Sequence, residues 1–101
     1  MKAEFKASLW VNGLPVELNP FVEEFLARTV TGAVSSLKGA EDIQSLKLHI
    51  GPGEVSIIVN SDELSLTPFP QDVIASTVTG LVSSLRGIDK IKSLRVDLKA
   101  L

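Results

Sequence analysis

The 101-residue chain contains no cysteine and no tyrosine, and it has a single histidine and a single tryptophan. The lack of cysteine excludes disulfides, thiolate nucleophiles and cysteine-ligated metals, and one histidine excludes every site that needs two imidazoles. No apolar run approaches the ~20 residues that span a membrane, and the N-terminal residues lack the apolar core of a signal peptide. We therefore expect a soluble cytoplasmic protein without membrane contact.

The chain also lacks an excess of positive charge. Ten lysines and arginines stand against twelve aspartates and glutamates, so the formal net charge is -2. Domains that bind nucleic acids normally carry a basic excess, and we therefore expect no nucleic-acid partner. Hydrophobic residues make up 45% and charged residues 22% of the chain, which is typical of a globular protein. The length predicts a single domain over residues 1–101.

An internal repeat is the strongest pattern present. A shift of 48 residues aligns Ser8–Ile50 with Ser56–Leu98 without a gap, and 19 of the 43 aligned pairs are identical. The longest shared block covers residues 29–39 and 77–87. This similarity indicates a tandem duplication. We expect two repeats, at about 5–50 and 54–98, related by a pseudo-twofold axis like the subunits of a homodimer.

Each repeat is predicted to fold as strand, strand, helix, strand. In the first repeat, residues 5–11 and 46–50 alternate apolar and polar side chains, which is the pattern of a half-buried strand. Asn12-Gly13 indicates a tight hairpin, followed by a short return strand at 16–18. The second repeat has strands at 55–59 and 94–98, with a turn at 60–63 and a return strand at 64–66. The fold class is therefore α+β, with six mostly antiparallel strands and two helices packed on one side.

The two helices have recognisable ends. Asn19-Pro20 and Thr67-Pro68 are typical of the first positions of a helix, and Gly39 and Gly87 are typical of its end. Apolar residues recur between these limits at helical spacing. We expect the following side chains to face the sheet: Phe21, Phe25, Leu26, Val30, Ala33, Val34 and Leu37, and Phe69, Val73, Ile74, Val78, Leu81, Val82 and Leu85.

The connection between the repeats, Gly51-Pro52-Gly53, is short. It favours an antiparallel hairpin of the third and fourth strands, and pseudo-symmetry then pairs the sixth strand with the first. The strands would form groups in the orders 2-1-6 and 5-4-3, which amounts to strand exchange between the repeats. The alternative keeps each third strand beside its own first strand, in the order 2-1-3.

The block shared by residues 29–39 and 77–87 contains hydroxyl groups and a glycine, which are also found in anion-binding sites. Anions bind at helix N-termini, but Gly32 and Gly80 fall in the middle of the predicted helices, where the N–H groups are already used. A glycine there costs about 1 kcal/mol relative to alanine. We expect that rows of small residues let the helices cross closely. These rows contain Thr29, Gly32, Ser36, Thr77, Gly80 and Ser84.

No catalytic or metal-binding arrangement is recognisable in the sequence. His49 has Asp97 as its counterpart in the second repeat, so no histidine-based catalytic set is repeated. Gly51-Pro52-Gly53 lacks the lysine and hydroxyl residue of a P-loop, and no helix follows it. The carboxylates do not have the spacing of metal ligands. We therefore expect no cofactor and no metal, and the sequence favours a non-enzymatic protein.

Trp10 and its counterpart Ile58 point to an interaction surface. Both alternate with residues that should face the helices, so both should lie on the opposite face of the sheet. Lys47, His49 and Arg95 share that face, which two helices on the other side leave uncovered. An exposed apolar pair with a polar rim is typical of an interaction site.

These features favour a small protein-interaction or self-assembly module whose partner is a protein, most simply a second copy in a homodimer. The alternative is a small-ligand-binding protein or a minor enzyme. Its pocket would lie between the helix pair and the sheet, lined by threonine and serine hydroxyls. An ordered pocket there would support the alternative, whereas a filled core would support the interaction module.

Overall fold

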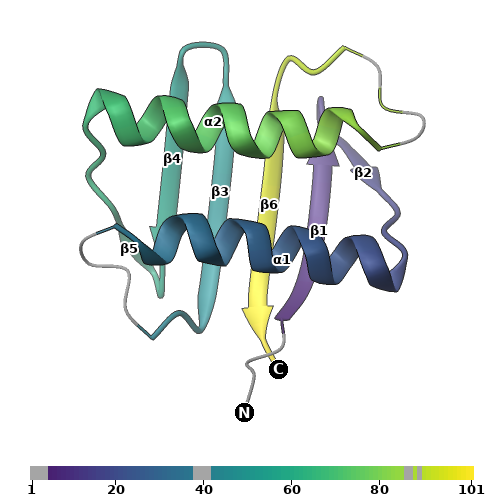
Figure 1. The fold of residues 1–101 in the computed structure, drawn as a ribbon, viewed down its shortest axis with the longest axis horizontal. Coiled ribbons are helices and arrows are strands. Elements are labelled where there is room, and N and C mark those ends of the chain that lie inside the picture. The colour runs from purple at the N-terminus through teal and green to yellow at the C-terminus, as the bar shows by residue number, and fades with distance from the viewer. Residues whose placement is uncertain (1–4, 38–41, 86–87, 89) are drawn as a thin grey trace.

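A computed structural model describes residues 5–37, 42–85, 88 and 90–101. These residues form two layers, with both helices on one face of a sheet (Figure 1). The elements in chain order are β1 (Phe5–Val11), β2 (Leu14–Val16), α1 (Pro20–Ser35), β3 (Ser45–Gly51), β4 (Glu54–Val59), β5 (Asp62–Glu63), α2 (Pro68–Ser83) and β6 (Leu94–Ala100).

All six strands belong to one open antiparallel sheet, in the order β2-β1-β6-β3-β4-β5. The predicted groups 2-1-6 and 5-4-3 are confirmed. The alternative order 2-1-3 is wrong, because β1 pairs with β2 and β6. A pairing of β3 with β6, which the sequence did not predict, joins the two groups. It satisfies the edges that β3 and β6 would otherwise leave open.

Two-residue turns close the outer hairpins. Asn12 and Gly13, between β1 and β2, have φ of 53° and 82°, as such a turn requires. Asn60 and Ser61, between β4 and β5, have φ of 51° and 74°. Because each turn uses only two residues, pairing resumes at once. The return strands therefore lie two residues earlier than predicted, and β5 is one residue shorter.

The side chain of Asn12 ties this hairpin to the loop before β6. Its Oδ1 accepts hydrogen bonds from the N–H groups of Lys92 and Ser93 at 2.7 and 3.1 Å, and its Nδ2 donates to the carbonyl of Lys90 at 2.7 Å. The Asn12 N–H donates to the Ser93 carbonyl at 2.9 Å. This loop is about eighty residues away in sequence and is held in place for the entry of β6.

Asn60 makes the corresponding contacts with the loop before β3. Its Oδ1 accepts from the N–H groups of Gln44 and Ser45 at 2.7 and 3.1 Å, and its Nδ2 donates to the Asp42 carbonyl at 2.9 Å. The Asn60 N–H donates to the Ser45 carbonyl at 3.0 Å. Each central strand of the sheet is therefore fixed at its start by an asparagine of an outer hairpin.

The core lies between the helices and the sheet, and the buried side chains in the described ranges are all apolar. Its centre is a row that crosses four strands in register, with each side chain at most 1% exposed: Leu9, Val96, Leu48 and Ile57. Full burial of such a side chain contributes roughly 1.5–3 kcal/mol. Because this row is buried, the face of the sheet that carries it must be covered by the two helices.

Both helices begin where the sequence predicts, at Pro20 and Pro68. The side chain of Asn19 caps the first helix by accepting a hydrogen bond from the Val22 N–H at 2.8 Å. Thr67 makes no side-chain cap hydrogen bond.

The helices end at Ser35 and Ser83, before the predicted stops. Those stops, Gly39 and Gly87, lie outside the described residues.

The helices bury a narrower stripe than predicted. Phe21, Phe25, Phe69 and Val73 are 74, 49, 77 and 45% exposed, so their expected place in the core is wrong. Successive helical residues are about 100° apart around the axis. Phe25 and Val73 directly precede the first buried residue of each helix, Leu26 and Ile74, so they point to one side of the buried stripe. Phe21 and Phe69 lie one helical turn before Phe25 and Val73 and point to the same side. The buried residues are Leu26, Ala27, Val30 and Val34 of α1 and Ile74, Val78 and Val82 of α2.

Replacement of Asn60 by alanine should lower the free energy of unfolding by about 3 kcal/mol, because it removes three side-chain hydrogen bonds that each contribute roughly 1 kcal/mol. Asn60→Asp keeps the accepting oxygen and loses the donor, so it should cost less. Urea denaturation of both variants checks this. An alanine variant that unfolds at the wild-type midpoint would show that the asparagine does not hold the loop.

Candidate functional site

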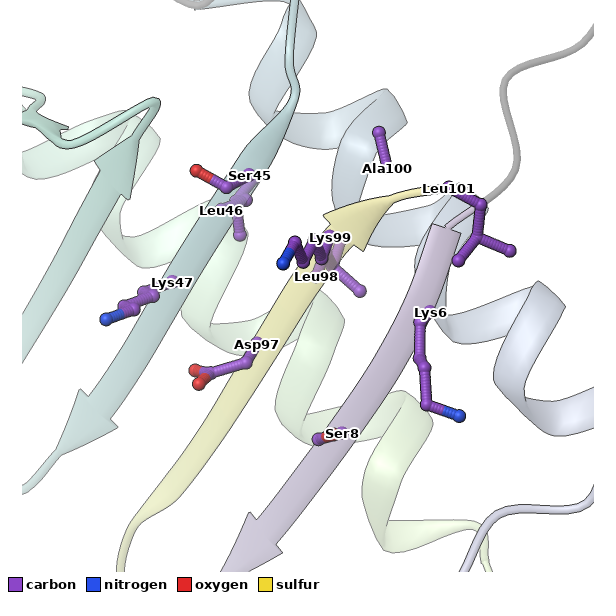
Figure 2. Close-up of a pocket in the computed structure, with 10 residues that line it drawn as sticks. All are labelled: Lys6, Ser8, Ser45, Leu46, Lys47, Asp97, Leu98, Lys99, Ala100 and Leu101. Carbon is purple, nitrogen blue, oxygen red and sulfur yellow. The ribbon is translucent and has the colours of Figure 1, made fainter.

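The face of the sheet opposite the helices carries the candidate surface. Strand register places all five predicted residues on it. Trp10 pairs with Arg95, Arg95 with His49, and Lys47 with Ile58. Figure 2 views part of this face, with the helices behind the sheet and polar side chains in front. Within the described ranges no further element covers it.

Trp10 and Arg95 form a preorganised pair on this face. The guanidinium carbon of Arg95 lies 4.8 Å from the centre of the Trp10 ring. Asp97, on the same strand as Arg95, accepts hydrogen bonds from Nε and Nη2 of Arg95 at 3.0 and 2.8 Å. These hydrogen bonds and the negative charge of Asp97 raise the pKa of Arg95 above its ordinary value. Arg95 is thus a permanent cation held over the indole.

Trp10 and Ile58 share this face but do not form one apolar patch. Strands β6 and β3 lie between β1 and β4, so the two residues are three strand spacings apart, about 14 Å. Lys47 lies directly opposite Ile58, and Arg95 lies opposite Trp10. The predicted apolar pair is corrected to two separate half-buried side chains, because β6 and β3 lie between β1 and β4.

The centre of the open face is basic, although the whole chain has a net charge of -2. Strands β1, β6 and β3 direct Lys6, Lys47, Arg95 and Lys99 to this side. Over the described lengths of these strands, Asp97 is the one carboxylate on the same side. Sequence reasoning missed Lys6 and Lys99, although their alternation with core residues was a usable signal.

A hollow of about 520 Å³ lies on this face beside the end of β6 (Figure 2). Side chains from three adjacent strands line it, including Lys6 and Ser8 of β1, Ser45 and Lys47 of β3, and Lys99 of β6. The serines are half-buried, whereas the lysines are exposed. The hollow therefore combines cations with hydroxyl groups.

The predicted helix crossing at the small residues is wrong. Gly32 and Gly80 are exposed, and a Cβ built on either would meet no atom within 4 Å beyond its neighbours and its helix's own backbone. The helices do contact each other and run in opposite directions across the sheet (Figure 1). Both glycines lie outside the buried stripe. Of the other residues in the rows, Thr29 is half-buried and Ser36, Thr77 and Ser84 are exposed.

Serine and threonine hydroxyls of the helices bond to their own helix. Ser36 donates to the Ala33 carbonyl at 2.8 Å, and Ser84 donates to the Gly80 carbonyl at 3.2 Å. Thr31 likewise donates to the carbonyl one turn before it. Thr31 and Ser35 line a surface hollow of about 500 Å³ beside the residues that precede β3.

The exposed phenylalanines form a second apolar feature, on the outer side of the helices. The rings of Phe21 and Phe25 stack with centroids 5.9 Å apart. Phe69 aligns with Phe21 when the sequence is shifted by 48 residues, and it is also exposed. Sequence reasoning missed this feature because it assigned these side chains to the core.

Comparison of the chain with protein-family models, curated proteins and solved structures finds no match. In the part of the chain that the structure describes, no helix is long and apolar enough to cross a membrane. Among the same residues, no three histidine, aspartate or glutamate side chains gather as metal ligands. The open face of the sheet, with Trp10, Arg95 and Asp97, is the candidate functional site.

Gly32→Ala and Gly80→Ala should each raise the free energy of unfolding by about 1 kcal/mol, because alanine is the better helix former and its Cβ meets nothing. The two effects should add, since the sites are independent. Gly53→Ala is the matched control and should destabilise the protein, because Gly53 has φ of 76°. Thermal denaturation measures all three. Destabilisation by either helix variant would show that the glycine is needed for packing.

Proposed function

We propose that this protein is a non-enzymatic interaction module that docks a protein partner on the open face of its sheet, most simply a second copy of itself. The observation that carries the proposal is the unit of Trp10, Arg95 and Asp97. Tryptophan and arginine dominate the binding energy of many interfaces. The bidentate contact with Asp97 holds Arg95 in place before a partner arrives, which lowers the entropy cost of docking.

We also propose that the fold arose by tandem duplication of a ββαβ unit, giving one domain of two repeats related by a pseudo-twofold axis. The 19 identities over 43 aligned residues support this origin. The matching hydrogen bonds of Asn12 and Asn60, which are aligned in the two repeats, support it independently. A twofold arrangement within the chain is compatible with symmetric self-association.

The energy available from the open face suits a weak to moderate homodimer. Full burial of a large apolar side chain contributes roughly 1.5–3 kcal/mol; because Trp10 is already half-buried, each copy supplies only part of this amount toward the cost of association. Four cations face one carboxylate on strands β1, β6 and β3. The same face also carries Glu54 on β4 and Glu63 on β5, so a second copy can set these carboxylates against the cations of the central strands.

A ligand-binding protein or minor enzyme with a pocket under the helices has less support. Seventeen buried apolar side chains fill the space between the helices and the sheet. The hollow of about 520 Å³ lies on the open face, and a second hollow of about 500 Å³ lies beside α1 and the start of β3. Neither occupies the place that the alternative requires.

Sedimentation of the wild type over a range of concentrations should show a reversible dimer that Trp10→Ser converts into a folded monomer. Ile58→Ser should have a smaller effect, because Ile58 lies away from the Arg95 pair. The control is Phe69→Ser, which removes a side chain that is 77% exposed on the other layer. It should leave the dimer intact.

A wild type that is monomeric at all concentrations would contradict self-association. A dimer lost with Phe69→Ser and kept with Trp10→Ser would move the interface to the helices. Circular dichroism of each variant separates loss of contact from loss of fold.

A further inference from the structure

The hollow on the open face has a surplus of positive charge that the docking proposal does not use. Three lysines and one aspartate line it: Lys6 on β1, Lys47 on β3, and Lys99 and Asp97 on β6. In the described part of the chain, none of them forms an ion pair; the ion pairs there join Arg28 to Glu24 and Arg95 to Asp97.

The carboxylate nearest to Lys47 in strand register, Asp97, already bonds to Arg95. Asp97 lies directly across from Lys47 in the pairing of β3 with β6. Both of its oxygens instead accept hydrogen bonds from Arg95. Asp97 is thereby bonded along its own strand, and Lys47 makes no ion pair among the described residues.

Two of the lysines also lie directly opposite each other. Lys6 pairs with Lys99 across β1 and β6, and Lys99 pairs with Ser45 across β6 and β3. Like charges at directly opposed positions destabilise a sheet. A bound anion would remove this repulsion, so the arrangement favours occupation by a negative group.

We propose that this hollow binds the phosphate group of a small phosphorylated molecule. Lysine ammonium groups are compact point charges suited to phosphate oxygens, and the hydroxyls of Ser8 and Ser45 supply neutral donors beside them. Three cations match a phosphate dianion better than a single carboxylate. A volume of about 520 Å³ is in the usual range of ligand sites, and it leaves room for the organic part of the molecule.

Nuclear magnetic resonance titration of the full chain with inorganic phosphate tests this site, with sodium chloride at equal ionic strength as the baseline. The amide signals of Ser8, Ser45 and Lys99 should shift saturably. Lys47→Gln and Lys99→Gln should each weaken binding about tenfold, as loss of a charge-assisted contact does. Lys92→Gln, an equal charge change in the loop before β6, should leave binding within twofold, a change of under about 0.5 kcal/mol by the ordinary affinity conversion.

Three results would overturn the proposal. One is the absence of saturable shifts beyond those caused by sodium chloride. Another is equal weakening by Lys92→Gln, which would mean general screening by charge. The third is a response to a single-stranded oligonucleotide with none to phosphate, which would assign the lysines to a nucleic-acid backbone. The Trp10→Ser variant should bind phosphate normally, so failure of the docking proposal and failure of this one are distinguishable.

Discussion

The sheet depends on the way its two central strands are anchored. Strand β6 enters beside β1 from a loop that the side chain of Asn12 holds, and β3 enters beside β4 from a loop that Asn60 holds. Because β3 and β6 then pair with each other, the hydrogen bonds of the sheet run without interruption from β2 to β5. Strands β1 and β3 of the first half both pair with β6 of the second half. We therefore expect the sheet to be stable only when both halves are folded.

This arrangement also determines where function can reside. The two helices cover one face of the six strands, and the core row through Leu48 and Val96 closes that face. The chemistry that remains is on the other face, where the central strands place their charged side chains. The open face has two parts, one on each side of the Arg95–Asp97 pair. One part presents Trp10 beneath a fixed guanidinium, and the other leaves lysines without a carboxylate partner.

Strand alternation, turn residues and helix starts were predictable from the sequence because each depends on local chemistry. The Asn12-Gly13 turn, the first residues of the helices and the face that carries Trp10 all follow from it. The pairing of β3 with β6 was not predictable, since it is a contact between two unsatisfied edges. The roles of Gly32 and Phe21 were missed because apolar and small residues cover more of each helix than the sheet can bury. The lysine hollow was missed because it depends on the pairing of β3 with β6, which brings β1, β6 and β3 together.

The most direct test of this account is equilibrium unfolding in urea followed by two probes. Trp10 is the single tryptophan and reports on the junction of β1 and β6, because Arg95 lies over its ring, whereas far-ultraviolet circular dichroism reports on all the helices and strands. If the exchanged central strands make one cooperative sheet, the two transitions will coincide. A tryptophan transition separated from the loss of secondary structure would mean that the halves unfold independently, and it would contradict the account.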